Sequence, residues 1–318
     1  MLWDELDIDI NTVPIEQLAT YTAVEYFLCH QSIPPQEATP LQRVQHYLES
    51  FYHLWEVEDW RRATQILTVI PDPQSNQELH DQLGVWGYYD QQEKLYKSLL
   101  GKLNPGCDAV CYNGLGNIYD ALGELNESES YHQKHLEVAR KLGDKAGEWK
   151  AIMGLGNVAK NRGQWQQAAT YYQQSLDILE KHPDAESPQG RAMLMGNLAS
   201  ILSRENPEES LHLATAALAI FRNLGNPYLI ARALVLMGDI YNSLKQPESA
   251  LKYHQQSLEI AEKCREVVAE IDAMKGIAEA NLQLNNCPLA QKWYQKCREL
   301  IRIIIGPWDS IHWFAVLP

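Results

Sequence analysis

The chain has 318 residues, of which 45% are hydrophobic, and its 41 acidic side chains against 27 basic ones give a formal net charge of −14 at neutral pH. This is a soluble globular composition, and the length favours two domains or a repeat solenoid over one compact core. The negative charge argues against nucleic acid as a general partner, because the molecule as a whole repels polyanions.

Residues 1–40 contain an apolar helical stretch, 15–29, followed by several prolines, and we expect a capping helix and a linker there. No apolar run reaches the ~18–20 residues that a membrane-spanning helix needs, and the start of the chain is acidic where a secretory signal is basic. The six cysteines are scattered through a long chain, which favours reduced thiols. We therefore expect a cytoplasmic protein with no membrane association.

Residues 41–103 contain two weaker helical hairpins. The first runs from Phe51 to Leu67 with Ala63 in its second helix, and the second is a shortened pair from Leu83 to Leu100. From residue 104 onward the chain is periodic. Glycines recur with separations of 40, 40 and 42 residues at Gly116, Gly156, Gly196 and Gly238. Small residues recur in parallel at Ser128, Ala168, Ser210, Ala250 and Ala290.

Each period contains two helical stretches, because apolar residues recur within it at intervals of three and four. Glycine and proline separate the stretches, and the two extra residues of the longer period fall in the turn 203–207. A glycine inside a helix costs ~1 kcal/mol relative to alanine. Four glycines in one register therefore predict close crossings of antiparallel helices, where only short side chains fit.

The segments Leu115-Gly116-x-x-Tyr119, Leu155-Gly156-x-x-Ala159 and Met237-Gly238-x-x-Tyr241 resemble tetratricopeptide repeats. The longer period is similar to that of kinesin light chains, of the LGN/Pins adaptors and of bacterial, notably cyanobacterial, repeat arrays attached to STAND-type signalling NTPases. This resemblance implies an all-α fold, a right-handed superhelix of antiparallel helix pairs, with five repeats over residues 104–305. Residues 306–318 form an apolar tail, which either folds back as a cap or docks elsewhere.

The sequence contains no phosphate-binding loop, no H-E-x-x-H, no G-x-S-x-G and no paired C-x-x-C motif. Gly114-Leu-Gly116-Asn117 imitates the start of a dinucleotide-binding motif, but no strand precedes it and it lies within a helix. We therefore expect no enzymatic activity and no cofactor. The competing interpretation is a hydrolase concealed in the N-terminal segment.

His132 and His135 are three residues apart on one helix, a spacing that suits two metal ligands. The equivalent positions of the next repeat hold Tyr172 and Ser175. This favours the interpretation that His132 and His135 pack between helices and that their ring nitrogens form hydrogen bonds. The cysteines are interpreted as small hydrophobic residues. We expect no metal site.

One polar column follows the glycines, with Asn117, Asn157 and Asn197 each one residue further along and Asp239 in the equivalent place. The next residue of a helix points about 100° away from the glycine, toward the inner face that first helices line in such superhelices. Each amide offers a donor and an acceptor to a peptide backbone, and the row resembles the asparagine ladder of the kinesin light chain and LGN/Pins groups. The alternative is that asparagine is simply tolerated on a wet surface.

Residues one turn away on the same face complete the predicted concave groove, which binds a protein or peptide segment in this hypothesis. The predicted site residues are Asn113, Asn117, Lys150, Asn157, Lys160, Arg191, Asn197, Arg232, Asp239 and Asn242. Their four cations predict a locally positive centre, unless they are ordinary solvated charges. Met153, Met193 and Val235 stand where a full carboxylate clamp has lysine or arginine, which argues against a ligand of the carboxylate-clamp type.

The sequence thus predicts a non-enzymatic scaffold that binds a protein or peptide in its groove. The alternative is the sensing arm of a bacterial STAND-type signalling or defence system that lacks its own NTPase domain. Neither the partner nor the oligomeric state follows from the residues.

Overall fold

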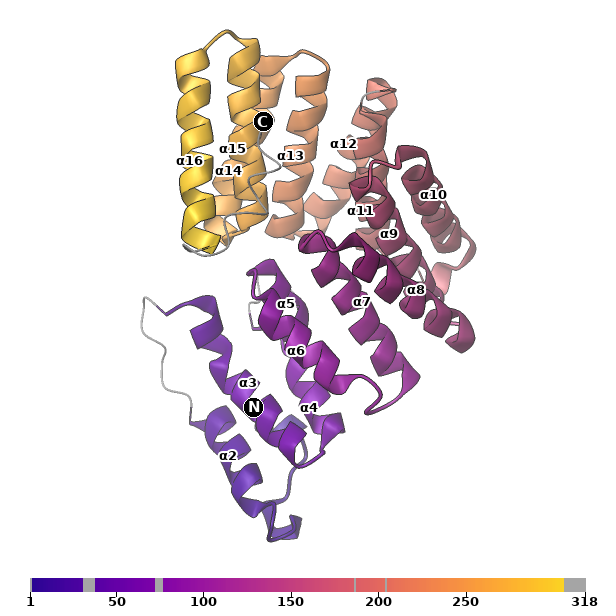
Figure 1. Cartoon of the computed structure of the whole chain (residues 1–318), viewed down its shortest axis with the longest axis vertical. Helices are drawn as coiled ribbons and strands as arrows, with labels where there is room; N and C mark the ends of the chain where they lie inside the picture. The colour runs from indigo at the N-terminus through magenta and orange to yellow at the C-terminus, as the bar shows by residue number, and fades with distance from the viewer. Residues whose placement is uncertain (1, 31–37, 72–76, 186, 204, 306–318) are drawn as a thin grey trace. The chain divides into compact units, whose positions relative to one another are not determined.

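The computed structural model describes residues 2–30, 38–71, 77–185, 187–203 and 205–305 (Figure 1). The elements of secondary structure in these ranges are helices, which confirms the predicted all-α fold. The chain divides into two compact units, Met1–Gly163 and Gln164–Pro318, and each is treated by itself below.

The first unit contains short helices near the N-terminus and longer ones toward residue 163, and successive helices from α2 to α4 and from α5 to α9 pack on one another. Its core holds large apolar side chains that are fully buried, among them Phe51, Leu54, Leu83, Leu95 and Leu115. The helices are α1 (Leu2–Glu5), η1 (Ile10–Thr12), α2 (Leu18–Cys29), α3 (Pro40–Glu56), α4 (Trp60–Leu67), α5 (Leu79–Val85), α6 (Tyr89–Leu99), α7 (Pro105–Ala121), α8 (Leu125–Leu142) and α9 (Lys145–Asn161).

The second unit is a run of antiparallel neighbours in which each helix packs on the next, and α13 also contacts α15. Two core clusters follow the run, one around Leu218, Phe221 and Leu234 and the other around Ala273 and Ile277. The helices are α10 (Trp165–Lys181), η2 (Pro183–Ala185), α11 (Pro188–Leu202), α12 (Pro207–Leu224), α13 (Pro227–Ser243), α14 (Pro247–Cys264), α15 (Val267–Gln283) and α16 (Cys287–Ile305).

The Leu-Gly-Asp and Leu-Gly-Asn segments between repeats end one helix and begin the next. Gly143 ends α8 in the left-handed conformation, with φ 68°, and the side chain of Asp144 accepts a hydrogen bond from the backbone N–H of Gly147 in the first turn of α9. Gly225 and Asn226 do the same between α12 and α13. Glycine meets no steric penalty at positive φ, and asparagine or aspartate satisfies the free amides of a helix start. These few residues therefore fix the length of each helix.

The segments predicted upstream form helices. The apolar stretch 15–29 contains α2, the hairpin with Ala63 is α3 and α4, and the shortened hairpin is α5 and α6. Ala63 is fully buried. The predicted apolar tail, 306–318, lies outside the described residues.

The small-residue column lies at the helix crossings. Ser128 of α8 donates a hydrogen bond from Oγ to the carbonyl oxygen of Gly116 at 2.9 Å, and Ser210 of α12 donates to the carbonyl oxygen of Ala199 at 2.6 Å. A serine hydroxyl reaches a helix carbonyl only when the two backbones are close, so these contacts agree with the predicted close approach.

Histidine rings occupy the space left by two of the four column glycines, Gly116 and Gly238. A Cβ on Gly116 would lie 2.6 Å from the ring of His132, and a Cβ on Gly154 would clash with the same ring from the following helix. His254 is held in the same way between Gly238, where the distance would be 2.5 Å, and Gly276. In both sets the histidine follows the first glycine by 16 residues and precedes the second by 22.

Gly196 differs: α11 and α12 approach closely, as the Ser210 contact shows, but the prediction that only glycine fits at this position was wrong. A Cβ there would meet only Cδ2 of Leu236, at an ordinary 3.7 Å. The reason lies in its neighbours: the column that holds His132 and His254 holds Ala214 in this repeat, and Leu236 stands where the other sets have a second glycine. The small side chain of Ala214 in α12 is thus compensated by the large side chain of Leu236 in α13.

Candidate peptide-binding site

All ten predicted site residues lie on the first helices of repeats. Asn113 and Asn117 belong to α7, Lys150, Asn157 and Lys160 to α9, Arg191 and Asn197 to α11, and Arg232, Asp239 and Asn242 to α13. The first five are in the first unit and the other five in the second.

The polar column after the glycines is accessible. Asn117 is exposed, Asn157 and Asn197 are half-buried, and the side chain of Asp239 is 53% exposed. Polar side chains in this register therefore reach the surface of the first helices at each repeat. The core of the helix pairs is formed by other faces of the same helices.

Each unit contributes two of the predicted cations. Lys150 and Arg232 are exposed, whereas Lys160 and Arg191 are half-buried. A guanidinium nitrogen of Arg191 lies 4.0 Å from a carboxylate oxygen of Glu180, and Lys150 lies 5.8 Å from the ring centroid of Trp149. The cations are thus placed beside acidic or aromatic neighbours.

Asn242 is buried, with 5% of its surface exposed, because its side chain fills the space between three helices. Its Nδ2 donates to the carbonyl oxygen of Gly276 on α15 at 3.2 Å and lies 3.3 Å from Nε2 of His254 on α14. In turn, Nε2 of Gln283 donates to the carbonyl oxygen of Asn242 at 3.1 Å. These bonds tie α13 to α15 at one end of their contact.

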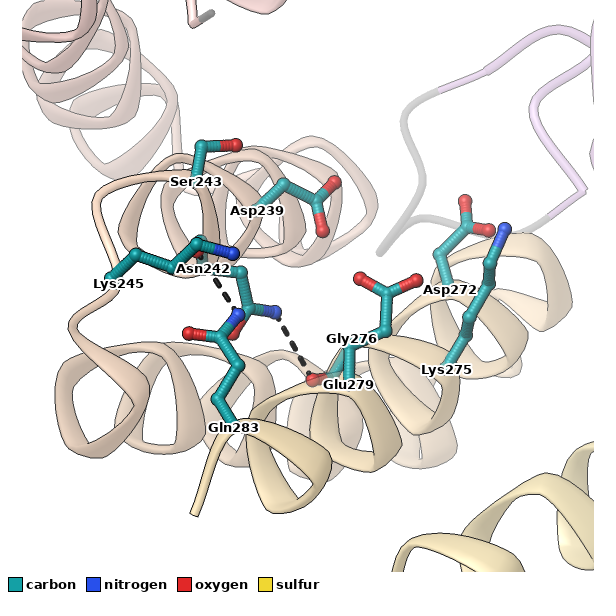
Figure 2. A pocket seen from close by; sticks show the side chains of 9 residues that line it. All are labelled: Asp239, Asn242, Ser243, Lys245, Asp272, Lys275, Gly276, Glu279 and Gln283. Atoms are coloured by element: carbon teal, nitrogen blue, oxygen red, sulfur yellow. Dashed lines mark hydrogen bonds between the residues drawn. The ribbon is translucent and has the colours of Figure 1, made fainter. Parts of the chain in front are cut away.

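Above this contact lies an open cleft of about 440 Å³ between α13 and α15 (Figure 2). Its lining is polar and contains three carboxylates and two ammonium groups. The lining residues are Asp239, Asn242, Ser243, Lys245, Asp272, Lys275, Gly276, Glu279 and Gln283. We call it the α13–α15 cleft.

Of the lining residues, the sequence prediction named only Asp239 and Asn242. The sequence contained a signal for two of the others, Glu279 and Asp272. The polar column that runs through Asn197 and Asp239 reaches Glu279 after another 40 residues, and the column of Arg232 reaches Asp272. In the last repeats both columns become acidic, so that acidic side chains line the cleft where the predicted groove centre has cations.

The negative charges in the cleft affect one another. Removal of water by the surrounding protein, followed by the charges of Asp272 and Glu279, raises the pKa of Asp239 to about 8, although Lys275 opposes the change. Loss of water also raises the pKa of Asp272. The charges of Asp272 and Glu279 therefore add negative potential at Asp239 to the effect of water removal, although its side chain is itself half exposed.

His132 and His135 are both buried, and burial lowers the pKa of His132 to about 3 and that of His135 to about 4. Neither ring nitrogen of His132 has a hydrogen-bond partner. The rings are thus neutral packing elements, without the hydrogen-bonding tip that the sequence predicted for His132. In the part of the chain that the structure describes, no three or more His, Cys, Asp or Glu side chains lie close enough together to hold a metal ion.

A second cluster of titratable groups joins α5 to α6. Nδ1 of His80 lies 2.8 Å from the hydroxyl of Tyr96, and Nε2 lies 2.7 Å from a carboxylate oxygen of Glu78. Burial opposes charge on His80, but the hydrogen bonds to Asp81 and Glu78 outweigh it and raise its pKa to about 9. This cluster stabilises a helix pair and leaves no side chain free for a ligand.

The model of the tetratricopeptide repeat family matches residues 108–181, 150–223, 190–263 and 229–303. These overlapping matches cover more than half of the 318 residues, and the chain belongs to the tetratricopeptide repeat family. The resemblance predicted from the glycine and small-residue columns is therefore confirmed. Repeats of this kind typically form non-catalytic scaffolds for protein interactions.

Several solved structures share the fold at low identity. The Rap conjugation gene regulator of the plasmid pLS20 in complex with the Phr* peptide is 16% identical and aligns over 94% of this chain and 89% of that chain, with a TM-score of 0.55. Aspartyl phosphate phosphatase F from Bacillus subtilis is 11% identical over 96% of this chain and 80% of that chain, with a TM-score of 0.61.

The STAND protein with a tetratricopeptide repeat sensor from Pyrococcus horikoshii is 17% identical over 93% of this chain and 47% of that chain, with a TM-score of 0.52. At these identities the similarities establish the fold alone. No curated protein matches the sequence significantly. Within the described ranges, none of the helices combines the length and the apolar character needed to cross a membrane.

Proposed function

We propose that this protein is a non-enzymatic scaffold that binds a peptide or an extended protein segment on the face lined by the first helices of its repeats, the concave groove predicted from the sequence. The observation that carries the proposal is the polar column itself. Asn117, Asn157, Asn197 and Asp239 recur once per repeat with their side chains exposed or half-buried.

Within each unit, a peptide laid across the first helices meets one such side chain per repeat. Each asparagine can donate to a backbone carbonyl and accept from a backbone amide, so the column suits an extended chain of varied sequence. The cations Lys150, Arg191 and Arg232 and the acidic α13–α15 cleft supply charge that selects among peptides. A protein of similar fold, the Rap conjugation gene regulator, was solved with a peptide bound, which supports the same class of ligand here.

The test begins with selection of binding peptides from a displayed random library against the whole chain. The selected peptide is then titrated by fluorescence anisotropy against the parent and against a variant with Asn117→Ala, Asn157→Ala and Asn197→Ala. The matched control replaces three exposed amides of second helices, on α8, α10 and α14, by Gln133→Ala, Gln173→Ala and Gln255→Ala.

We expect the asparagine variant to lose at least tenfold in affinity, because a bound peptide would leave backbone groups unpaired, and the glutamine variant to bind as the parent does. Both variants should keep their helical circular dichroism, since alanine is the better helix former. Equal loss in both variants, or no loss in either, would contradict the use of this face.

A second candidate function is the sensing arm of a STAND-type system that works with a separate NTPase chain. The shared fold with the sensor-containing protein of Pyrococcus horikoshii favours it. Both hypotheses require the same binding face. They differ in that only the sensing arm changes the rate of ATP hydrolysis by a partner chain when the peptide is added.

A further inference from the structure

The α13–α15 cleft contains acceptors that nothing in the protein occupies. Within the described ranges no direct hydrogen bond or ion pair of Asp272 or Glu279 is found, although the charges of Lys275 and Arg232 act on Asp272. The carboxylate of Asp239 has the neutral ring of His254 beside it, with Nε2 at 3.6 Å, and also feels the charge of Lys275. Figure 2 shows the carboxylates of Asp239 and Glu279 directed toward one another across the space between the helices.

Two amide oxygens at the cleft lack partners as well. Oδ1 of Asn242 and Oε1 of Gln283 are buried and accept no hydrogen bond. The orientation of both amides is fixed by their nitrogens, which donate to the carbonyl oxygens of Gly276 and Asn242 respectively. An unpaired buried acceptor is costly, and Asn242 is 95% buried since only 5% of it is exposed. Two acceptors beside the cleft are therefore left without a protein donor.

The chemistry of that donor follows from the lining. Ionised carboxylates and amide oxygens can only accept from a ligand, and once Asp239 has lost its proton, above its pKa of about 8, the charge of the three carboxylates exceeds that of Lys245 and Lys275. The ligand must therefore be a cation with several N–H groups. A bare metal ion fits less well, because among the described residues no group of three or more His, Cys, Asp or Glu side chains is placed to hold one.

A guanidinium group satisfies both requirements. It is planar, permanently charged, has five N–H donors and no acceptor, and binds a carboxylate with two parallel hydrogen bonds. Its breadth lets it contact acceptors on opposite walls. A lysine ammonium, with three donors around one point, reaches fewer of them.

We propose that the α13–α15 cleft binds the guanidinium group of an arginine side chain, with Asp239 and Glu279 as its carboxylate partners. The proposal rests on the proposed function, since the arginine belongs to the bound peptide. It specifies that one residue of the peptide is an arginine and that the repeats containing α13 and α15 bind it.

The test uses a small probe, so that it does not depend on any peptide. N-acetyl-arginine amide is titrated into the whole protein and binding is followed by NMR chemical shifts. N-acetyl-citrulline amide serves as the neutral isostere and N-acetyl-lysine amide as the second cation. The variants are Asp239→Asn and Glu279→Gln, and the control is Glu270→Gln, a carboxylate of α15 outside the cleft.

At pH 9, where Asp239 with its pKa of about 8 is mostly ionised, we expect the arginine compound to bind the parent and the Glu270→Gln variant equally, and at least tenfold more weakly to the other two variants. The citrulline compound should bind at least tenfold more weakly than the arginine compound, and the lysine compound should fall between them. Circular dichroism checks that each variant is folded. Asp239→Asn should fold normally, because it removes a carboxylate that its neighbours repel.

Equal binding of the arginine and citrulline compounds, or unchanged binding in both cleft variants, would overturn the proposal. The peptide selection separates this failure from failure of the proposed function. If selected peptides bind but are indifferent to Asp239→Asn and Glu279→Gln, the arginine site is refuted and the scaffold function stands. If no peptide is selected, the scaffold function fails, and the small probe still decides on the cleft.

Discussion

The packing of His254 between two glycines gives a sharp prediction about stability. Gly238→Ala places a methyl group 2.5 Å from the ring of His254, well inside contact distance, whereas Gly196→Ala places one 3.7 Å from Leu236. Both glycines lie in the interior of first helices, where alanine gains ~1 kcal/mol over glycine. Forcing an extra methyl into a filled core costs ~1–3 kcal/mol.

We therefore expect Gly196→Ala to stabilise the protein by up to about 1 kcal/mol and Gly238→Ala to be neutral or to destabilise it by up to about 2 kcal/mol. The two variants should thus differ by ~1–3 kcal/mol. Urea unfolding followed by circular dichroism at 222 nm measures the difference. Since both substitutions remove the same residue type from the same column, helix propensity cancels between them.

A double-mutant cycle attributes the difference to the ring. In a His254→Ala background the methyl group of Gly238→Ala has room, so the substitution should become neutral or stabilising, with a coupling energy of ~1–3 kcal/mol. If Gly238→Ala is as stable as Gly196→Ala, or costs as much without the ring as with it, the histidine does not explain why glycine stands at this position.

Three further predictions concern protons and metals. Burial lowers the pKa of His254 from 6.5 to about 4, so the unfolded chain binds a proton that the folded one does not, and stability is lost as pH falls from 6.5 to 4. In urea titrations over this range the parent should lose ~3 kcal/mol more than His254→Gln, which lacks the group; equal losses would refute this. Affinity for N-acetyl-arginine amide should rise about tenfold from pH 7 to 9, because Asp239, with a pKa of about 8, loses its proton over this range. The charged and titratable groups that face Asp239 are Asp272, Lys275, Glu279 and His254. Asp239→Asn should remove this dependence, and a flat profile for the parent would count against the carboxylate partner. Chelators should leave the melting temperature unchanged, since the buried histidines are packing elements, and a drop of several degrees in EDTA would show otherwise.

The fold was predictable because its determinants are local and repeated. Leu142-Gly-Asp marks a helix end and a helix start by backbone conformation and capping alone. The glycine and small-residue columns report helix crossings, which recur at the same register in each repeat. Both kinds of signal can be read from one chain without knowledge of its three-dimensional contacts.

The packing partners of the glycines and the α13–α15 cleft were harder to predict from the sequence. Gly196 looks like Gly116 and Gly238 in sequence, and its free space depends on Leu236 in the next repeat. Glu279 looks like an ordinary solvated helix charge until α13 and α15 are side by side. Only then do its carboxylate and that of Asp239 share one cleft, so its role follows from a pairing of helices rather than from a motif.

Site-specific photo-crosslinking tests the central claim, that first helices carry the binding face, most directly. A photoreactive amino acid is placed in turn at Asn117, Asn197, Gln133 and Gln255, and each protein is irradiated with the labelled peptide obtained by selection. We predict crosslinks from the positions on α7 and α11 and none above background from those on α8 and α14. Crosslinks mainly from Gln133 and Gln255 would contradict the account and assign the ligand to the second helices.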